Sequence, residues 1–404
     1  LDAPFDKTDV ILAWTPKMPE EYENFYSGDI FDILPLLVWE GNGSAAARYR
    51  YHNLVAELFA RNYIDRIGKW CREHNIKFTG HMISEGSLEG QTCNIGDVMR
   101  AYRGLTIPGV DILGDCDDFL SIKQVASSSR QFGANGVLSE LYGVTDWDFD
   151  FRDQKYQGDW QTALGVTLRC HHLSWYTMEG EAKRDYPPTF NYQAPWHEKY
   201  SYLENHYSRA NYILSLGKPD IKIGVLNPIE SLWAHFGNKM QTSCAQNDIQ
   251  KAYDFTVNTL MRNNIDFDCI SEANMEMLFK ETSDGTLCLG EESYEVVILP
   301  DCETLRKSTQ KMLSDFESRG GKLIFVGQAP KFTDGEETNA FAEREAMPMF
   351  ENVLTESLDK YRKVRIYSPY GAPSNRFFHN HIKCDDSTEY LFLASNVRPS
   401  GKHN

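Results

Sequence analysis

Apolar positions in the first half of the chain alternate between a helical period and short buried runs. Residues 50–75 carry apolar side chains three and four positions apart, which predicts a helix with one apolar face. Four short apolar runs predict strands at residues 76–81, 110–113, 136–140 and 165–173. Two further helices are predicted between them, at residues 121–132 and 152–163. Strands separated by helices are typical of parallel βαβ units.

The pattern restarts near residue 218. Strands are predicted at 221–226, 267–270, 296–300 and 322–327, with helices at 248–263 and 304–319. This order indicates a second α/β domain of flavodoxin-like type. Beyond residue 360, alternating apolar residues at 364–367 and 390–393 indicate the start of a β domain. We therefore expect three domains, at residues 1–217, 218–345 and 346–404.

The four strands of the first half share a polar ending. Each stops at or beside a charged residue or a histidine, as strands do at the reactive face of a (β/α)8 barrel. A barrel needs ~250 residues, more than precede the second domain. The fold class expected is therefore α/β, with part of a (β/α)8 barrel followed by the flavodoxin-like domain. The first barrel strands are expected upstream of Leu1. The chain lacks GxGxxG and GxxxxGK motifs, which argues against a nucleotide site.

The composition of the chain limits the classes of molecule that it is expected to bind. The net charge of −17 makes nucleic acid an improbable partner, and the 13% aromatic content favours carbohydrate. Nine widely spaced cysteines without a CxxC pair predict free thiols, no metal site, no cofactor and a cytoplasmic location. The sequence contains no apolar run as long as a membrane span, so no membrane partner is expected.

A carboxylate at a strand end is the strongest chemical signal. In Val137–Gly143, Glu140 closes an apolar run and is followed closely by Tyr142. Glycoside cleavage needs two carboxyl groups, one protonated and one ionised. Glu140 is the candidate for the ionised group, and Glu85, in the loop after the strand predicted at residues 76–81, is its candidate partner. A rim ion pair for Glu140 and a solvated loop position for Glu85 are the structural alternatives.

Other residues near these strand ends are candidate sugar contacts. Asp111 and Asp115 add possible carboxylates, and only one of the adjacent His171 and His172 can face the site. The tryptophans offer stacking surfaces, Trp175 being the first choice. The substrate-binding residues predicted are His81, Asp115, Tyr142, Trp147, His172, Trp175, Glu179 and Glu181.

The second domain resembles that of glycoside hydrolase family 42, β-galactosidases with a barrel and a glutamine-amidotransferase-like domain. The matching segments are Ile223–Asn227, Ser231–Trp233, Asn264–Asp268, Val297–Pro300 and Gly320–Leu323. The first half is similar to the α-L-rhamnosidase-like enzymes of family 106, in Gly80–Met82, Ile95–Asp97, Gly109–Asp111 and Gly158–Gln161. The resemblance implies that Glu140 is the nucleophile on the seventh strand. The acid/base would then lie on the fourth strand, before Leu1.

These observations predict a glycosidase acting on a neutral sugar linkage, β-galactosidase-like or α-L-rhamnosidase-like, with homo-oligomerisation possible. One alternative is a catalytically incomplete fragment that binds carbohydrate or mediates oligomerisation. Another is an amidotransferase-like enzyme centred on Cys302, which would require a histidine beside that sulfur.

Overall fold

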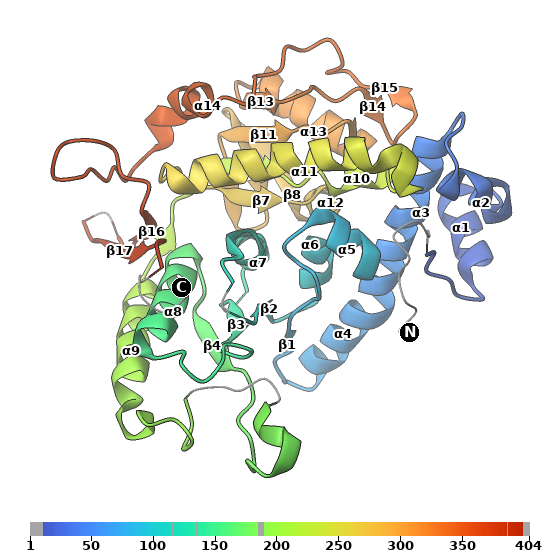
Figure 1. The fold of residues 1–404 in the computed structure, drawn as a ribbon. Helices are drawn as coiled ribbons and strands as arrows, with labels where there is room; N and C mark the ends of the chain where they lie inside the picture. The colour runs from blue at the N-terminus through green and yellow to red at the C-terminus, as the bar shows by residue number, and fades with distance from the viewer. Residues whose placement is uncertain (1–10, 115, 135, 185–189, 386, 399–404) are drawn as a thin grey trace.

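A computed structural model describes residues 11–114, 116–134, 136–184, 190–385 and 387–398. Two parallel sheets form its centre, with helix α7 lying between them (Figure 1). The first sheet has the order β1-β2-β3-β4, in which neighbours in sequence are neighbours in space. Its strands are β1 (Thr79–Gly80), β2 (Ile107–Ile112), β3 (Leu138–Leu141) and β4 (Leu168–His171). This curled parallel sheet is consistent with part of a (β/α)8 barrel, the fold class predicted.

Capped helices connect these strands. Asp118 accepts a hydrogen bond from the backbone of Ser121 and begins α7 (Phe119–Gln131), and Asp150 and Asp153 form a capping box at the start of α8 (Phe151–Leu164). The remaining helices of this half are α1 (Met18–Tyr26), α2 (Ile30–Val38), α3 (Ser44–Phe59), α4 (Arg66–Glu73), α5 (Leu88–Asn94), α6 (Val98–Tyr102) and α9 (Ser201–Leu214). A π-helical segment, Ala60–Asp65, joins α3 to α4. The predicted helix 50–75 is thus part of a longer helical run.

The second sheet is also parallel and has the order β13-β11-β6-β7. Numbered along the chain and read from β7, this order is 2-1-3-4, the beginning of the doubly wound order 2-1-3-4-5. Its strands are β6 (Ile223–Leu226), β7 (Asp268–Ile270), β11 (Val296–Pro300) and β13 (Lys322–Val326). The helices around it are α10 (Ile229–Ala234), α11 (Lys239–Arg262), α12 (Glu272–Leu278), α13 (Lys307–Ser318) and α14 (Glu351–Leu358). One hydrophobic cluster contains residues of both parallel sheets, among them Ile112 and Ile298.

Three small sheets complete the described structure. The strands β8 (Phe279–Ser283), β9 (Thr286–Leu289) and β10 (Glu292–Tyr294) form an antiparallel sheet. A second sheet contains β12 (Thr304–Leu305), β14 (Phe332–Thr333) and β15 (Glu337–Thr338). The third pairs β16 (Phe377–Lys383) with β17 (Glu389–Ser395) and with β5 (Lys218–Pro219). Segment 364–367 forms no named strand, although Tyr367 makes an isolated bridge to Pro373.

Candidate active site

One face of the first sheet carries polar side chains in register. Asp111 on β2 pairs with Glu140 on β3, and Glu140 pairs with Cys170 on β4. Register partners on neighbouring parallel strands point to the same face, so these three side chains form a row. The alternate residues Val110, Ile112, Ser139 and Leu141 are buried on the opposite face. The row lies near the carboxyl ends of the strands, where barrel enzymes carry their reactive groups.

His81 and Glu140 share a hydrogen bond. His81 Nε2 lies 2.9 Å from Glu140 Oε2, and His81 Nδ1 lies 3.2 Å from the Met82 carbonyl oxygen. A carbonyl oxygen only accepts, so Nδ1 carries a proton. The second proton then belongs either to Nε2, giving an imidazolium facing a carboxylate, or to Glu140, facing a neutral imidazole. Burial lowers the pKa of His81, but the hydrogen bond to the Met82 carbonyl and neighbouring acidic groups, Asp111 and Glu140 among them, raise it overall. This direction favours the imidazolium–carboxylate pair.

Asp111 provides a second carboxyl group with a different environment. Burial raises its pKa, and the Glu140 charge adds to this against the opposing effect of His81. Its Oδ2 lies 3.9 Å from His81 Nδ1, and its buried Oδ1 has no hydrogen-bond partner among the described residues. Burial thus inclines Asp111 to hold a proton, beside a Glu140 whose carboxyl group is hydrogen-bonded to His81.

Glu85, the predicted partner of Glu140, is buried and contacts the backbone of Asp111. It is 4% exposed, and its Oε1 accepts hydrogen bonds from Met82 N at 2.8 Å and from the Tyr102 hydroxyl at 2.9 Å. Its Oε2 accepts from Asp111 N at 3.2 Å. Burial raises the pKa of Glu85 to about 8. Because its oxygens are directed at the loop after β1 and the backbone of β2, Glu85 connects the segments that carry His81 and Asp111.

His172 reaches Glu140 from the end of β4. Its Nε2 lies 4.0 Å from Glu140 Oε1. Gly143 permits this approach, since a Cβ atom at that position would lie 2.3 Å from His172 Cγ. Three non-glycine residues in the same loop have positive φ, namely Tyr142 at 71°, Val144 at 59° and Asp146 at 61°. A β-branched residue rarely adopts such a backbone, and strain of this kind concentrates at functional sites.

The two predicted tryptophans lie together. The ring centroids of Trp147 and Trp175 are 5.1 Å apart at an interplanar angle of 47°. Trp175 is 8% exposed and Trp147 is 42% exposed, so the buried Trp175 ring packs beneath Trp147, whose ring is accessible to solvent. Tyr142, also predicted as a sugar contact, is fully buried and donates its hydroxyl to the Gln154 carbonyl. Its position makes it a support for the loop.

The other predicted residues have different surroundings. Glu179 is exposed, and Glu181 forms an exposed ion pair with Arg184. His171 projects to the opposite face from the row, where its Nε2 lies 2.9 Å from the Tyr200 hydroxyl. Asp115 lies outside the described residues.

Two residues of the row's neighbourhood escaped the sequence analysis. Cys170 follows from register alone, once β3 and β4 are aligned. Tyr102, which donates a hydrogen bond to Glu85, lies on helix α6 and has no sequence signal that connects it to the strand ends.

Cys302 lacks the surroundings of a reactive thiol. It is 1% exposed, and burial raises its pKa well above the ordinary value. The neighbouring charges that act on it, Glu272 and Asp301, raise its pKa further. A nucleophilic cysteine needs the opposite environment.

In the part of the chain that the structure describes, no group of three or more His, Cys, Asp or Glu side chains is placed to hold a metal ion. Within the same ranges, every helix is too short or too polar to cross a membrane.

Comparison with solved structures finds a similar fold in several known proteins. A rhamnosidase from Novosphingobium sp. PP1Y superposes with a TM-score of 0.68 and 16% identity, over 94% of this chain and 38% of that one. The fold is one that glycoside hydrolases share. A GH42 β-galactosidase from G. stearothermophilus gives a TM-score of 0.54 at 11% identity, over 80% of this chain and 50% of that one. The GH42 exo-carrageenase of Bacteroides ovatus gives a TM-score of 0.54 at 12% identity, over 91% of this chain and 53% of that one.

The resemblance predicted from sequence is thereby confirmed for the fold. The chain spans about two fifths to one half of the length of these structures. No family model and no curated protein sequence matches the chain.

Proposed function

We propose that this chain carries the catalytic face of a glycoside hydrolase that cleaves a neutral sugar linkage. The observation that supports this most directly is the pair of carboxyl groups on adjacent strands, Asp111 and Glu140, with His81 hydrogen-bonded to Glu140. The fold shared with rhamnosidase and β-galactosidase structures agrees with it.

The roles follow from the environments of the two groups. Glu140, which is hydrogen-bonded to His81 Nε2, is the group that attacks the anomeric carbon or activates water. Asp111, whose pKa is raised, is the group in this chain best suited to protonate the departing oxygen. Adjacent strands lie ~4.8 Å apart, so one glycosidic linkage can reach both carboxyl groups. His172 approaches the other oxygen of Glu140, and Glu85 fixes the backbone on either side.

Trp147 is the proposed sugar platform. Its ring is accessible and is supported by Trp175, in the loop that follows β3. Sugars stack on such faces through their axial C–H groups, and a supported indole loses little conformational freedom on binding.

A second candidate is a carbohydrate-binding piece whose acid catalyst belongs to a longer protein. The observation that favours this candidate is that the chain spans only 38% and 50% of the length of the rhamnosidase and β-galactosidase structures. In that case Glu140 and Trp147 would still contact sugar, while hydrolysis would need a carboxyl group from elsewhere.

Two assays separate these candidates. The chain is incubated with a panel of aryl glycosides that includes an α-rhamnoside and a β-galactoside, and binding of the free sugars is followed by saturation-transfer NMR. Hydrolysis of a panel member supports the enzyme, and binding without hydrolysis supports the incomplete site. Neither hydrolysis nor binding would overturn the proposal.

A further inference from the structure

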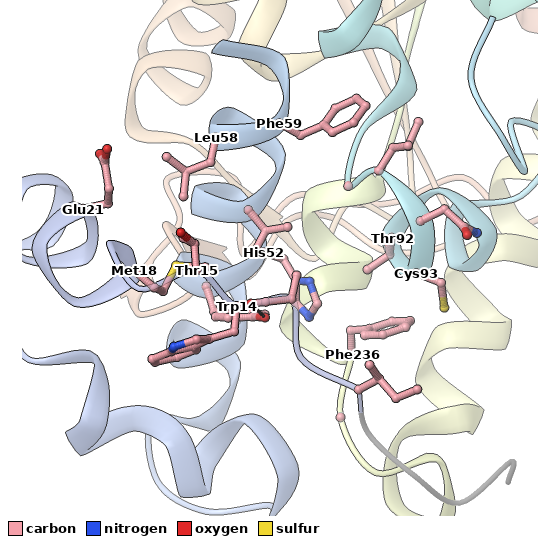
Figure 2. Close-up of a pocket in the computed structure, with 18 of the residues that line it drawn as sticks. Trp14, Thr15, Met18, Glu21, His52, Leu58, Phe59, Thr92, Cys93 and Phe236 are labelled. Atoms are coloured by element: carbon pink, nitrogen blue, oxygen red, sulfur yellow. Dashed lines mark hydrogen bonds between the residues drawn. The ribbon is translucent and has the colours of Figure 1, made fainter. Parts of the chain in front are cut away.

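A cavity of about 680 Å³ lies outside the carboxylate site. It is bounded by the segment before α1, by α3 and α5, and by the turn between α10 and α11. Figure 2 shows Trp14, Thr15 and Met18 on one side of it, Phe236, Thr92 and Cys93 on the other, and His52 between them. None of His81, Asp111 and Glu140 lines it. Its volume falls in the range of ~300–1,000 Å³ that small-molecule sites occupy.

The walls of this cavity are apolar and partly open to solvent. Trp14 is 47% exposed and Ile11 is 55% exposed, although both are large apolar side chains. Val55, Leu58 and Phe59 from α3 continue the apolar surface. Covering exposed apolar area is favourable at ~25 cal/mol per Å², so an apolar molecule would gain free energy by entering.

Two of the charged groups that line the cavity form ion pairs with other residues of the chain. Glu21 forms an ion pair with Arg61 at 2.7 Å, and Lys239 pairs with Glu89. Burial lowers the pKa of His52 to about 3, so its imidazole is neutral in ordinary buffers. A charged molecule would lose its hydration inside the cavity, where the lining cation Lys17 is exposed at the rim, and this disfavours ionic ligands.

Several polar groups in the walls already have partners within the chain. The Tyr51 hydroxyl donates to the Ala13 carbonyl at 2.7 Å, the Thr92 hydroxyl to the Leu88 carbonyl at 2.8 Å, and Gln246 Nε2 to the His235 carbonyl at 2.7 Å. These donors are committed to holding the walls. Recognition would therefore depend mainly on shape and on contact with rings.

We propose that this cavity is a binding site for an uncharged, ring-bearing apolar small molecule, distinct from the carboxylate site. The rings of Trp14, His52, Phe59 and Phe236 would contact its faces and edges. This site is independent of the proposed glycosidase activity, and its test does not use hydrolysis.

The neutral dye N-phenyl-1-naphthylamine is a suitable probe, because its fluorescence rises in apolar surroundings. The full chain is expected to bind one equivalent of dye saturably. Val55→Trp places an indole in the cavity and should weaken binding at least tenfold. Val397→Trp makes the same change at a position that is 47% exposed and outside the cavity, and should leave the affinity unchanged. Circular dichroism melts check that each variant folds, and Leu58→Trp replaces Val55→Trp if the latter does not.

Three outcomes would overturn the proposal. Absence of saturable binding to the full chain is the first. Equal affinity in the parent and in the folded cavity-filling variant would place the dye elsewhere. Binding that emerges only in Phe5→Ser, and not in the parent, would identify the chain's own first residues as the occupant.

Discussion

The two parallel sheets of this molecule use their faces in opposite ways. In the second sheet, every residue of the three strands β6, β7 and β11 is buried. In the first sheet, one face of β3 and β4 is accessible, and it carries Glu140 and Cys170 as well as Leu168, which is 40% exposed. A sheet covered on both sides contributes stability, whereas an accessible face with titratable groups can meet a substrate. We therefore assign structure to the second sheet and chemistry to the first.

The largest expected effect concerns a charge buried beside the second sheet. Arg130 on α7 donates its Nε to Asp268 Oδ1 at 3.0 Å, and Asp268 on β7 is fully buried. Arg130→Ala leaves that carboxylate without its cation and should lower the free energy of unfolding by about 3–5 kcal/mol. Arg319→Ala removes an exposed pair to Asp315 and should cost about 0–1 kcal/mol. Urea unfolding measures both, and equal losses would contradict the contrast.

A matched pair of truncations compares the sheets directly. Ile298, on β11, is fully buried, and Ile298→Ala should cost about 2–5 kcal/mol. Leu168 lies on the accessible face of β4, and Leu168→Ala should lower the free energy of unfolding by under about 0.5 kcal/mol. Urea denaturation of the two variants checks the difference. A large loss for Leu168→Ala would show that this face is covered in solution.

Much of this contrast could be predicted from the sequence, and the failures have physical causes. The apolar run before Glu140 placed that carboxylate at a strand end, because burial and length together specify a parallel strand. The burial of Glu85 could not be predicted, since it depends on Tyr102, which contacts it from helix α6. The β8–β9 hairpin was missed despite a usable signal. Asp284 and Gly285, with φ of 49° and 73°, form the Asp-Gly turn that connects its strands.

The buried Glu85 should make stability depend on pH. Its pKa is raised to about 8 in the folded chain against an ordinary value near 4.5. Between these values the folded state holds a proton that the unfolded state has released. Stability from this group is therefore complete below about pH 4.5 and falls by about 1.4 kcal/mol per pH unit as the pH rises toward 8.

Glu85→Gln removes this titration. The difference in unfolding free energy between parent and variant should change with that sign across the same interval, as measured by urea unfolding at several pH values. A difference that stays constant with pH would show that Glu85 is ionised throughout.

A smaller effect is expected at His81. The carboxylates around it raise its pKa, and Glu140→Gln removes one of them. The pKa of His81 should therefore fall in the variant, as followed by NMR of its imidazole during a pH titration. His74, whose Nδ1 contacts the Trp70 carbonyl on α4, serves as the control histidine. An unchanged His81 pKa would mean that the two side chains do not interact in solution.

The most direct test of the central claim is the rate of glycoside hydrolysis by Glu140→Gln. The amide keeps the size of the side chain but can neither attack nor accept a proton, so the rate should fall about 10²–10⁴-fold. Glu198→Gln, the same change at an exposed position on the surface, should keep the parent rate. Loss confined to Glu140→Gln, with unfolding curves unchanged, is the predicted result. A Glu140→Gln rate within threefold of the parent would contradict the assignment of the chemistry to this face.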